Sequence, residues 1–392
     1  MMDLSVAAIA SGHLLFFIPG PAPWSMQGAL RSGGFRPYVA AGPVETAGCI
    51  HDNGLTRKNR RASLSGAEIC FFATSKSGLG HLRRTATIAR SLRQAAPERI
   101  LRLISNARPE GLEPEDMAAF DTVHVAERSA MAGALPMGGK RILVLDTVTV
   151  PGIEALDSPM VLILRETPVG EMHRFCLAQG RPWDQVIVAN PREHWMPDVS
   201  ALAACDVLPV GWIYRPTGAR TASGAGIARV LVATGGGGTV DTARVLYAGI
   251  DDLLGRTRRA GGRFHVVQAI GPRAQGFGRL RQADEAVDPG GRLNAFFRDA
   301  DVVLSTSGYN SVLELATTDT PTLLFPIPRS IDDQAARARI WAHRLGAWHD
   351  AAAPGLAADW LLQQIADPRR RAPVDLGESG ERAAAAAILR LG

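Results

Sequence analysis

The stretch STSGYNSVLELATTDTPTLLFPIPRSIDDQ, residues 305–334, decides the fold. Its small residues turn a strand into a helix N-terminus, where free backbone N–H groups and the helix dipole can hold a phosphate. Glu314 lies about two turns into that helix, placed to accept hydrogen bonds from a ribose diol. Asp333 and Gln334 follow a second strand end and can reach a sugar. The structural alternative is a strand–helix unit that Ser307 caps and in which Glu314 is solvated.

The composition is that of a globular protein with room for two domains of ordinary size. Of the 392 residues, 46% are hydrophobic and 21% are charged, and the net charge is +5. The basic residues are almost all Arg, and they form no stripe interleaved with aromatic residues, so we expect no nucleic-acid partner. The positive charge suits anionic substrates such as nucleoside diphosphates, and a loose contact with an anionic membrane.

No C-x-x-C pair occurs among the four cysteines, which are Cys49, Cys70, Cys176 and Cys205. A chain of this size does not need disulfides, so we expect reduced thiols and a cytoplasmic protein, with peripheral contact to the inner face of the membrane as an option. No apolar run is long enough to predict a transmembrane helix. The first residues lack the positive charge of a signal peptide, which we therefore do not expect.

Residues 1–66 fit poorly with the rest of the chain. They contain closely spaced prolines, scattered glycines and the basic run at 57–61, and they follow no period of 2 or 3.6. We predict a poorly ordered N-terminal extension, or sequence upstream of a later start. The alternative is an arm that binds a membrane or a partner.

From Glu68 onward, apolar runs alternate with helical segments, which is typical of βα units in a parallel sheet. Strands are expected at 69–74, 100–105, 122–125, 142–146, 161–164, 186–189, 230–233, 264–269, 302–305 and 322–325. Helices are expected at 82–95, 240–254, 293–298 and 379–391, and residues 341–348 continue the alternation. Residues 215–228 resemble a linker. We therefore predict the α/β class, with two doubly wound Rossmann-like domains facing across a cleft, at 67–217 and at 226–392 with its C-terminal helix.

The sequence GLGH at residues 78–81 directly follows the first expected strand. Gly78 and Gly80 allow a tight turn and a close approach of ligand to backbone. His81 opens the next helix, and because histidine ordinarily titrates near neutral pH, it is a candidate general base for an acceptor hydroxyl. Three basic residues beside it could meet an anionic acceptor: Lys76, Arg83 and Arg84. A hydrogen-bonded structural histidine and a solvated basic helix face are the alternatives.

A run of four glycines, residues 235–238, stands at the corresponding place in the second half. Glycine-rich loops between a strand and a helix cradle phosphates, so we predict that Gly236, Gly237 and Gly238 bind a diphosphate. The run matches neither the dinucleotide fingerprint nor the Walker loop. A flexible turn is the alternative.

Polar residues also follow three other expected strands. Arg165 and Glu166 end one of them, and Glu166 is a second candidate base, while a surface Arg–Glu pair is equally plausible. Asp146 ends another strand in the same way, and Asn190 to Glu193 follow a third. No H-E-x-x-H, D-x-D or paired Cys/His spacing is present, so we expect neither a metal site nor a bound cofactor.

With these motifs the chain resembles the GT-B glycosyltransferases, specifically the MurG-like group. It is most similar to a bacterial branch of predicted glycosyltransferases that pairs a G-x-G-H-x-x-R loop with an S-x-G-Y-N-S/T-x-x-E segment. Here these are Gly78 to Arg84 and Ser305 to Glu314. The branch also carries an Arg-acid pair at a strand end and a Pro-Arg after a strand, matched by Arg165-Glu166 and Pro191-Arg192. The resemblance covers roughly residues 68–350.

The resemblance implies an inverting, metal-independent transfer from a nucleotide sugar, UDP-linked, to a small-molecule or lipid-linked acceptor. The implied donor-binding residues are Gly236, Gly237, Gly238, Ser307, Gly308, Asn310, Glu314, Asp333 and Gln334. The implied acceptor side has Gly78, Gly80, Arg83 and Arg165, with His81 and Glu166 as the catalytic candidates. The Asp-Asp-Gln at 332–334 departs from the usual pattern of the group and leaves the donor sugar open.

Two other functions remain open on the same fold. One is a sugar-nucleotide epimerase or hydrolase, which needs several carboxylates and basic residues crowded around the sugar. The other is a non-catalytic partner subunit of a glycosyltransferase. The presence of His81, Glu314 and Gln334 argues against a decayed site.

Overall fold

The computed structural model describes residues 66–75, 78–109, 111–136, 138–198, 202, 206–220, 226–235, 240–271 and 278–392. Two predictions fall outside these residues: the N-terminal extension up to residue 65, and the diphosphate-binding glycines at 236–238. The part of the expected linker at 215–220 contains neither helix nor strand.

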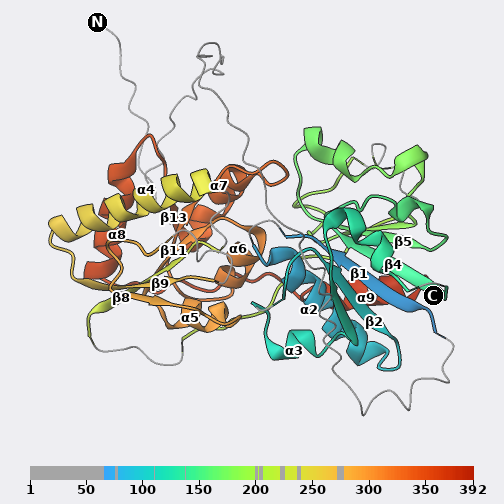
Figure 1. Ribbon diagram of the computed structural model, residues 1–392. Coiled ribbons are helices and arrows are strands. Elements are labelled where there is room, and N and C mark those ends of the chain that lie inside the picture. Colours follow the sequence, from blue (N-terminus) through green and yellow to red (C-terminus); the bar gives the residue numbers. More distant parts are fainter. Residues whose placement is uncertain are drawn as a thin grey trace, which may run out of the picture. The chain divides into compact units, whose positions relative to one another are not determined.

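The first half of the chain forms a seven-stranded parallel sheet with the strand order β3-β2-β1-β4-β5-β6-β7 (Figure 1). Its strands are β1 Glu68–Ala73, β2 Leu101–Ser105, β3 Thr122–Val125, β4 Arg141–Asp146, β5 Met160–Leu164, β6 Gln185–Val188 and β7 Val207–Pro209. Six of these were expected from the sequence. The short β7 was not, because a three-residue strand carries too little pattern.

Strand β1 shows why these apolar runs form strands rather than helices. Ile69 and Phe71 belong to one hydrophobic core, and Cys70 and Phe72 to another, and all four are at most 1% exposed. Side chains alternate between the two faces of a strand. A run that is apolar at every position therefore fits a strand that is buried on both faces, as in a parallel sheet with both faces covered.

The helical elements of this half are mostly short. The long helix α2, Gly80–Ala95, connects β1 to β2, and α3 spans Pro114–Met117. The other connections contain short 3₁₀-helices: η1 Arg128–Ala130, η2 Ala132–Ala134, η3 Ile153–Ala155, η4 Val169–Phe175 and η5 Ala178–Gly180. The sheet thus presents its loops at the carboxyl ends of its strands, where ligands bind in such folds.

The second half forms a six-stranded parallel sheet with the order β10-β9-β8-β11-β12-β13. Its strands are β8 Ala228–Ala233, β9 Phe264–Ala269, β10 Glu285–Val287, β11 Val302–Thr306, β12 Thr322–Phe325 and β13 Gly346–Trp348. Its helices are α4 Val240–Arg259, α5 Leu293–Asp299, α6 Tyr309–Ala316, α7 Gln334–Leu345 and α8 Pro354–Ala366. The predicted class is confirmed: both halves are α/β domains built on parallel sheets.

The turn from α7 into the edge strand β13 depends on a glycine. Gly346 has φ +147°, and a Cβ there would lie 2.7 Å from the carbonyl oxygen of Thr322 and 2.7 Å from the ring of Trp360. Residues other than glycine rarely adopt that backbone conformation. Gly346 thus lets β13 pair with β12 directly after the helix ends.

The C-terminal helix α9, Glu381–Leu389, packs against α2 of the first half. Figure 1 shows the two helices side by side, α9 in red and α2 in blue. Ala384, Ala385, Ala387 and Ile388 are buried in this contact region, and Gly380 donates its N–H to the carbonyl of Trp212 at 2.7 Å. The sequence predicts this helix as part of the second domain, residues 226–392. Its small alanines allow close approach to α2 instead.

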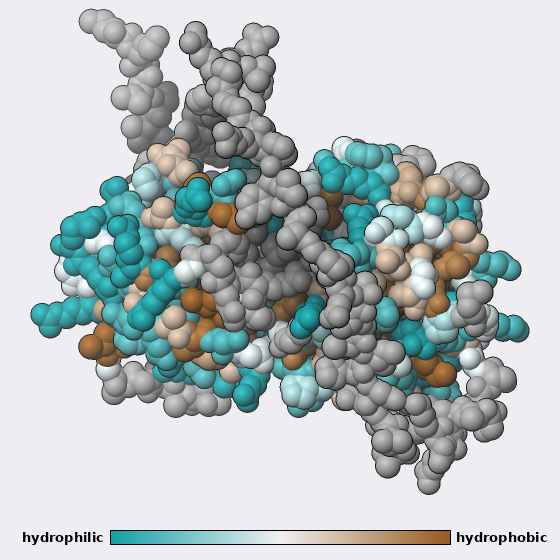
Figure 2. All heavy atoms as spheres, in the orientation of Figure 1, coloured by the Kyte–Doolittle hydropathy of each residue, from teal (hydrophilic) through white to brown (hydrophobic). Residues whose placement is uncertain are grey.

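Hydrophilic and hydrophobic residues are interspersed on the face shown in Figure 2. Large apolar side chains that are exposed, such as Val169, Val245 and Leu356, come from separate elements. In the described part of the chain, no helix combines the length and the apolar character needed to cross a membrane.

Candidate functional site

A cavity of about 390 Å³ collects residues from both halves of the chain. The predicted residues that line it are Gly78, Gly80, His81, Arg83, Arg165, Gly308, Asn310, Glu314 and Gln334. Thr234 and Gly235, at the start of the glycine run, line it as well. Three other predicted residues, Glu166, Ser307 and Asp333, are not among the lining residues. The cavity thus brings most of the predicted donor and acceptor residues together.

His81 forms a pair with a buried aspartate. Its Nδ1 lies 2.9 Å from Oδ1 of Asp146, which ends β4 and is 1% exposed. Arg84 donates to Asp146 as well, from Nε to Oδ2 at 2.9 Å. Burial acts to raise the pKa of Asp146, but Arg84 and His81 outweigh it and lower this pKa to about 2. Asp146 is therefore an ionised acceptor that orients the imidazole, and the sequence had ranked it only as a minor candidate.

Next to this pair, Thr147 has an unusual backbone conformation. Its φ is +50°, in the left-handed region that non-glycine residues rarely occupy. The hydroxyl of Thr147 donates to the carbonyl of Ile163 at 3.1 Å and accepts from Arg84 at 2.9 Å. Such conformations persist where surrounding contacts hold them, often at functional sites.

Arg83 and Glu314 form an ion pair that joins helices α2 and α6. Nη1 of Arg83 lies 3.2 and 3.1 Å from the two carboxylate oxygens, and Glu314 is 4% exposed. Burial raises the pKa of Glu314, and the nearby guanidinium groups of Arg83 and Arg215 only partly offset this. Glu314, which the sequence assigns to the ribose, is thus bound by Arg83, which the sequence assigns to the acceptor side.

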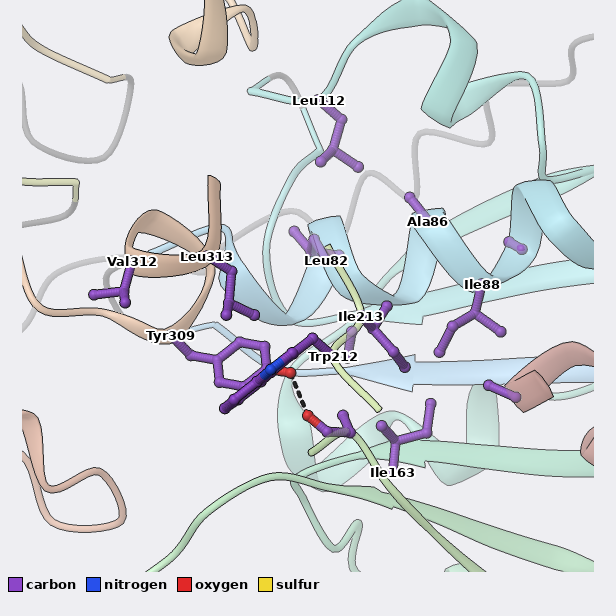
Figure 3. Close-up of a cluster of buried hydrophobic side chains, with 14 of the residues drawn as sticks. Leu82, Ala86, Ile88, Leu112, Ile163, Trp212, Ile213, Tyr309, Val312 and Leu313 are labelled. Atoms are coloured by element: carbon purple, nitrogen blue, oxygen red, sulfur yellow. Dashed lines mark hydrogen bonds between the residues drawn. The ribbon is translucent and has the colours of Figure 1, made fainter. Parts of the chain in front are cut away.

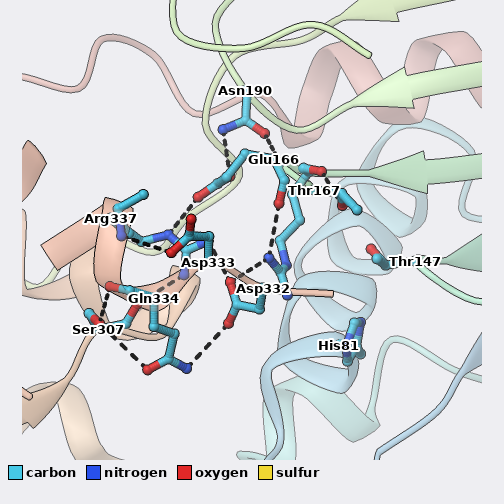
Figure 4. Close-up of polar contacts among 12 residues, drawn as sticks. His81, Thr147, Glu166, Thr167, Asn190, Ser307, Asp332, Asp333, Gln334 and Arg337 are labelled. Carbon is cyan, nitrogen blue, oxygen red and sulfur yellow. Dashed lines mark hydrogen bonds and ion pairs between the residues drawn. The ribbon is translucent and has the colours of Figure 1, made fainter. Parts of the chain in front are cut away.

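A second group of ion pairs links the loop after β5 to the start of α7 (Figure 4). Asp332 accepts from Arg165 at 2.9 Å and pairs with Arg337 at 2.6 Å. Arg337 also donates to Glu166 at 2.5 Å, and Asn190 donates to Glu166 at 2.9 Å. All of these side chains are mostly buried, so they hold the two halves together at this point.

These contacts fix the charge of both carboxylates. Burial raises the pKa of Glu166 and of Asp332, but Arg337 and Arg165 outweigh it, so that both pKa values are lowered. Glu166, the second candidate base, is thus held ionised by arginine and does not line the cavity.

The predicted sugar-binding residues at the start of α7 are largely engaged within the protein. Asp333 is exposed and caps the helix, accepting from the N–H of Ala336 at 2.9 Å. The side-chain amide of Gln334 donates to Asp332 at 3.2 Å. Ser307 donates its hydroxyl to the carbonyl of Gln334 at 2.8 Å. Ser307 does not cap α6, which begins without a side-chain cap.

Tyr309, the first residue of α6, is the tyrosine of the S-x-G-Y-N-S/T segment but was not among the predicted site residues. Its ring is 5% exposed and lies beside Trp212, with the ring centroids 6.0 Å apart (Figure 3). Its hydroxyl donates to the carbonyl oxygen of Ala189 in the first half. The motif does not show which residues surround the ring, so these contacts come from the structure alone.

Backbone conformation requires glycine at Gly235, whose φ is +60°, but not at Gly78, Gly80 or Gly308. Gly78, Gly80 and Gly308 do not have left-handed φ values, and a Cβ at Gly78 would meet nothing within 4 Å. At Gly308 the nearest atom would be Oγ of Ser311 at 4.0 Å. These glycines therefore leave open space around their Cα atoms, where a ligand can approach the backbone closely.

Among the described residues, no three His, Cys, Asp or Glu side chains gather in a way that could hold a metal ion.

No family model matches the chain. A curated relative, the UDP-N-acetylglucosamine–N-acetylmuramyl-(pentapeptide) pyrophosphoryl-undecaprenol N-acetylglucosamine transferase of Granulibacter bethesdensis, is 31% identical over 189 residues. These residues are 46% of this chain and 44% of the relative, so the chain matches less than half of that protein's length. The crystal structure of Acinetobacter baumannii MurG has a TM-score of 0.50 and 11% identity, over 83% of this chain and 100% of that chain. The chain therefore has the GT-B fold of MurG, and its sequence is MurG-like over about half its length.

Proposed function

We propose that the protein is a glycosyltransferase that moves a sugar from a nucleoside diphosphate sugar, UDP-linked, to a hydroxyl or amine acceptor. One observation carries the proposal: the His81–Asp146 pair and the N-terminus of α6 line or adjoin the same cavity. A base for the acceptor and a phosphate-binding helix end are what such a transfer requires.

On the donor side, the diphosphate would lie at the N-terminus of α6, beside Gly308 and Asn310. Free backbone N–H groups and the helix dipole favour negative charge there. The glycines at 236–238 would complete the diphosphate site, next to Thr234 and Gly235 in the cavity wall. Glu314 would accept hydrogen bonds from the ribose hydroxyls. The ribose would then either share this carboxylate with Arg83 or displace Arg83 from it.

The sugar would lie toward residues 332–334. Gln334 lines the cavity, and its contacts with Ser307 and Asp332 hold its side chain in one place. Asp333 would not contact the sugar. Its role would be indirect, because it caps α7 and so helps to fix the start of the helix that carries Gln334. The transferred group is of the hexosyl or N-acetylhexosaminyl type, in keeping with the name of the curated relative.

In the proposed reaction, the acceptor oxygen or nitrogen attacks the anomeric carbon while the bond from this carbon to the diphosphate oxygen breaks. Since ionised Asp146 can only accept a hydrogen bond, Nδ1 of His81 carries the proton between them. Nε2 is then free to take the proton that the acceptor loses. The bonding electrons leave with the diphosphate, whose charge α6 stabilises.

A single direct displacement inverts the anomeric centre. The cavity arginines supply positive charge for the departing diphosphate, so the proposed transfer does not depend on a metal ion. Arg83, Arg84 and Arg165 line the cavity but are paired with carboxylates. Further positive charge in the lining comes from Arg128, Arg174 and Arg329. The acceptor is a small molecule or a lipid-linked group. In the second case the protein works at the cytoplasmic face of a membrane, where its positive net charge favours peripheral contact.

A thermal-shift panel with UDP, GDP, dTDP, CDP and their common sugars tests the proposal. A nucleotide at 100 times its Kd stabilises the native state by about 2.7 kcal/mol, or roughly 2–4 °C in Tm for a chain of this size. We expect a selective shift with UDP. No shift with any nucleotide would contradict the donor site.

Substitution of His81→Ala separates the remaining functions. We expect the UDP shift to persist and sugar transfer to fall by about 10²- to 10⁴-fold. His265→Ala is the matched control, because His265 is exposed on β9 and does not line the cavity. Equal activation of a second transferase by wild type and His81→Ala would instead identify a partner subunit. Conversion of the nucleotide sugar without an acceptor would identify an epimerase or hydrolase.

A further inference from the structure

Tyr309 lies where three buried guanidinium groups converge. The Cζ atoms of Arg84, Arg165 and Arg337 are 5.3, 5.9 and 6.0 Å from its ring centroid. A guanidinium group within about 6 Å of an aromatic ring is attracted by the ring's quadrupole, most strongly when both are desolvated. The ring of Tyr309 is thus in favourable contact with three guanidinium groups at once.

Each of these arginines has a carboxylate partner, and the partners belong to different parts of the site. Arg84 binds Asp146, which orients His81 in the first half of the chain. The other two bind Asp332, which precedes α7 in the second half. The ring of Tyr309 is therefore the point at which the two ion-pair groups meet.

Tyr309 also connects this meeting point to the proposed donor site. Tyr309 is the first residue of α6, next to Gly308 at the proposed diphosphate site. Its hydroxyl is bound to Ala189 of the first half. A movement of the α6 N-terminus on donor binding would shift the ring against Arg84, and Arg84 is bonded to the carboxylate that holds His81.

We propose that Tyr309 is a positioning residue that, through Arg84, aligns the His81–Asp146 pair with the donor-binding end of α6. This inference rests on the proposed function for its catalytic meaning. The ring carries the effect, because the ring faces the three guanidinium groups. The hydroxyl contributes to the contact between the two halves of the chain.

Two substitutions separate the ring from the hydroxyl. Tyr309→Phe keeps the ring, so we expect turnover within about threefold of wild type. Tyr309→Leu removes the ring, and we expect kcat to fall by about 10- to 100-fold, a part of the general-base contribution, while KM for the donor changes by less than about threefold. A change in KM alone, with kcat retained, would overturn the proposal.

A measurement without substrate keeps this test separate from the proposed function. The hydrogen-bonded imidazole N–H between His81 and Asp146 gives a downfield proton NMR resonance, which His81→Gln identifies by its loss. We expect Tyr309→Phe to retain this resonance and Tyr309→Leu to lose or broaden it. Even if the protein turns over no donor, the resonance still tests whether Tyr309 positions the His81–Asp146 pair. A resonance unchanged in Tyr309→Leu would overturn the proposal, as would its loss in Tyr309→Phe.

Phe264→Leu provides the matched control. Phe264 is 7% exposed in the same half of the chain, and Arg258 lies 5.1 Å from its ring centroid, but neither residue lines the cavity. This control loses a buried ring and its cation–π contact outside the site. We therefore expect Phe264→Leu to change Tm without changing kcat or the resonance. Should Tyr309→Leu not fold, Tyr309→Met replaces it, since methionine fills irregular space, with the same two outcomes.

Discussion

Arg83 of α2 bonds both carboxylate oxygens of Glu314 of α6, at 3.2 and 3.1 Å, across 231 residues of sequence. Glu314 is buried, and its raised pKa shows that burial is not fully offset by the nearby guanidinium groups. Losing Arg83 would leave a buried carboxylate with weaker compensation. The pair therefore makes the contact between the two halves depend on charge as well as on packing.

The first prediction is a double-mutant cycle on this pair. Arg83→Met leaves Glu314 without its nearest cation, so we expect a loss of about 3 kcal/mol in the free energy of unfolding. In the Glu314→Gln background the same substitution should lose much less, with a coupling energy of about 1–3 kcal/mol by urea denaturation. Arg256→Met is the control, because Arg256 and Asp252 form an exposed pair with an expected effect below about 0.5 kcal/mol. A coupling energy near zero would contradict the role of the pair.

The second prediction separates two kinds of glycine. Gly308 has φ −64° and ψ 147°, which alanine adopts freely, so Gly308→Ala should fold with Tm nearly unchanged. Its Cβ would occupy space at the proposed diphosphate site, and we expect UDP affinity to fall by about tenfold or more in calorimetry, equivalent to about 1.4 kcal/mol. Gly346→Ala should do the opposite, because its Cβ clashes with Thr322: Tm falls, and the folded protein binds UDP as before. Wild-type UDP affinity in Gly308→Ala would argue against this diphosphate site.

The third prediction concerns acid stability. The pKa of Asp146 is about 2 in the folded protein against 3.8 ordinarily. Because this pKa is lowered, its contribution of roughly 2 kcal/mol is present above pH 4 and is lost as pH falls toward 2. The gap in unfolding free energy between wild type and Asp146→Asn should therefore narrow across this window. Asp359→Asn, at an exposed position of α8, should show a constant gap. A gap for Asp146→Asn that stays constant with pH would mean that the ion pair does not stabilise the fold.

Much of the fold could be predicted from the sequence because most of the strands are short runs of mainly apolar residues. The run at β1 illustrates this, since both of its faces meet a core. The short edge strands β7 and β10 could not be predicted, because three residues carry no period. The packing of α9 on α2 was also missed. An Ala-rich helix reveals that one face is buried, but not which element covers it.

The candidate site was predictable as a set of loops but not as a set of contacts. The positions at strand ends placed His81 and Glu314 near one cavity, since the carboxyl ends of parallel strands share an edge. Which charge meets which depends on side-chain geometry across the whole chain. Asp146 therefore ranked too low, and Tyr309, with three arginines around its ring, was not singled out.

The fourth prediction tests the placement of the C-terminal helix. Ile388 of α9 is fully buried, and Ile388→Ala should lower the free energy of unfolding by about 2–4 kcal/mol. Because α9 packs against α2, hydrogen exchange should accelerate in residues 80–95 and not in β11. Leu361→Ala in α8 is the matched control, since Leu361 is equally buried but belongs to the core of the second half. Its exchange should accelerate in β8 and β11 instead. If Ile388→Ala instead accelerated exchange in β11 and not in residues 80–95, α9 would pack within the second domain, as the sequence predicts.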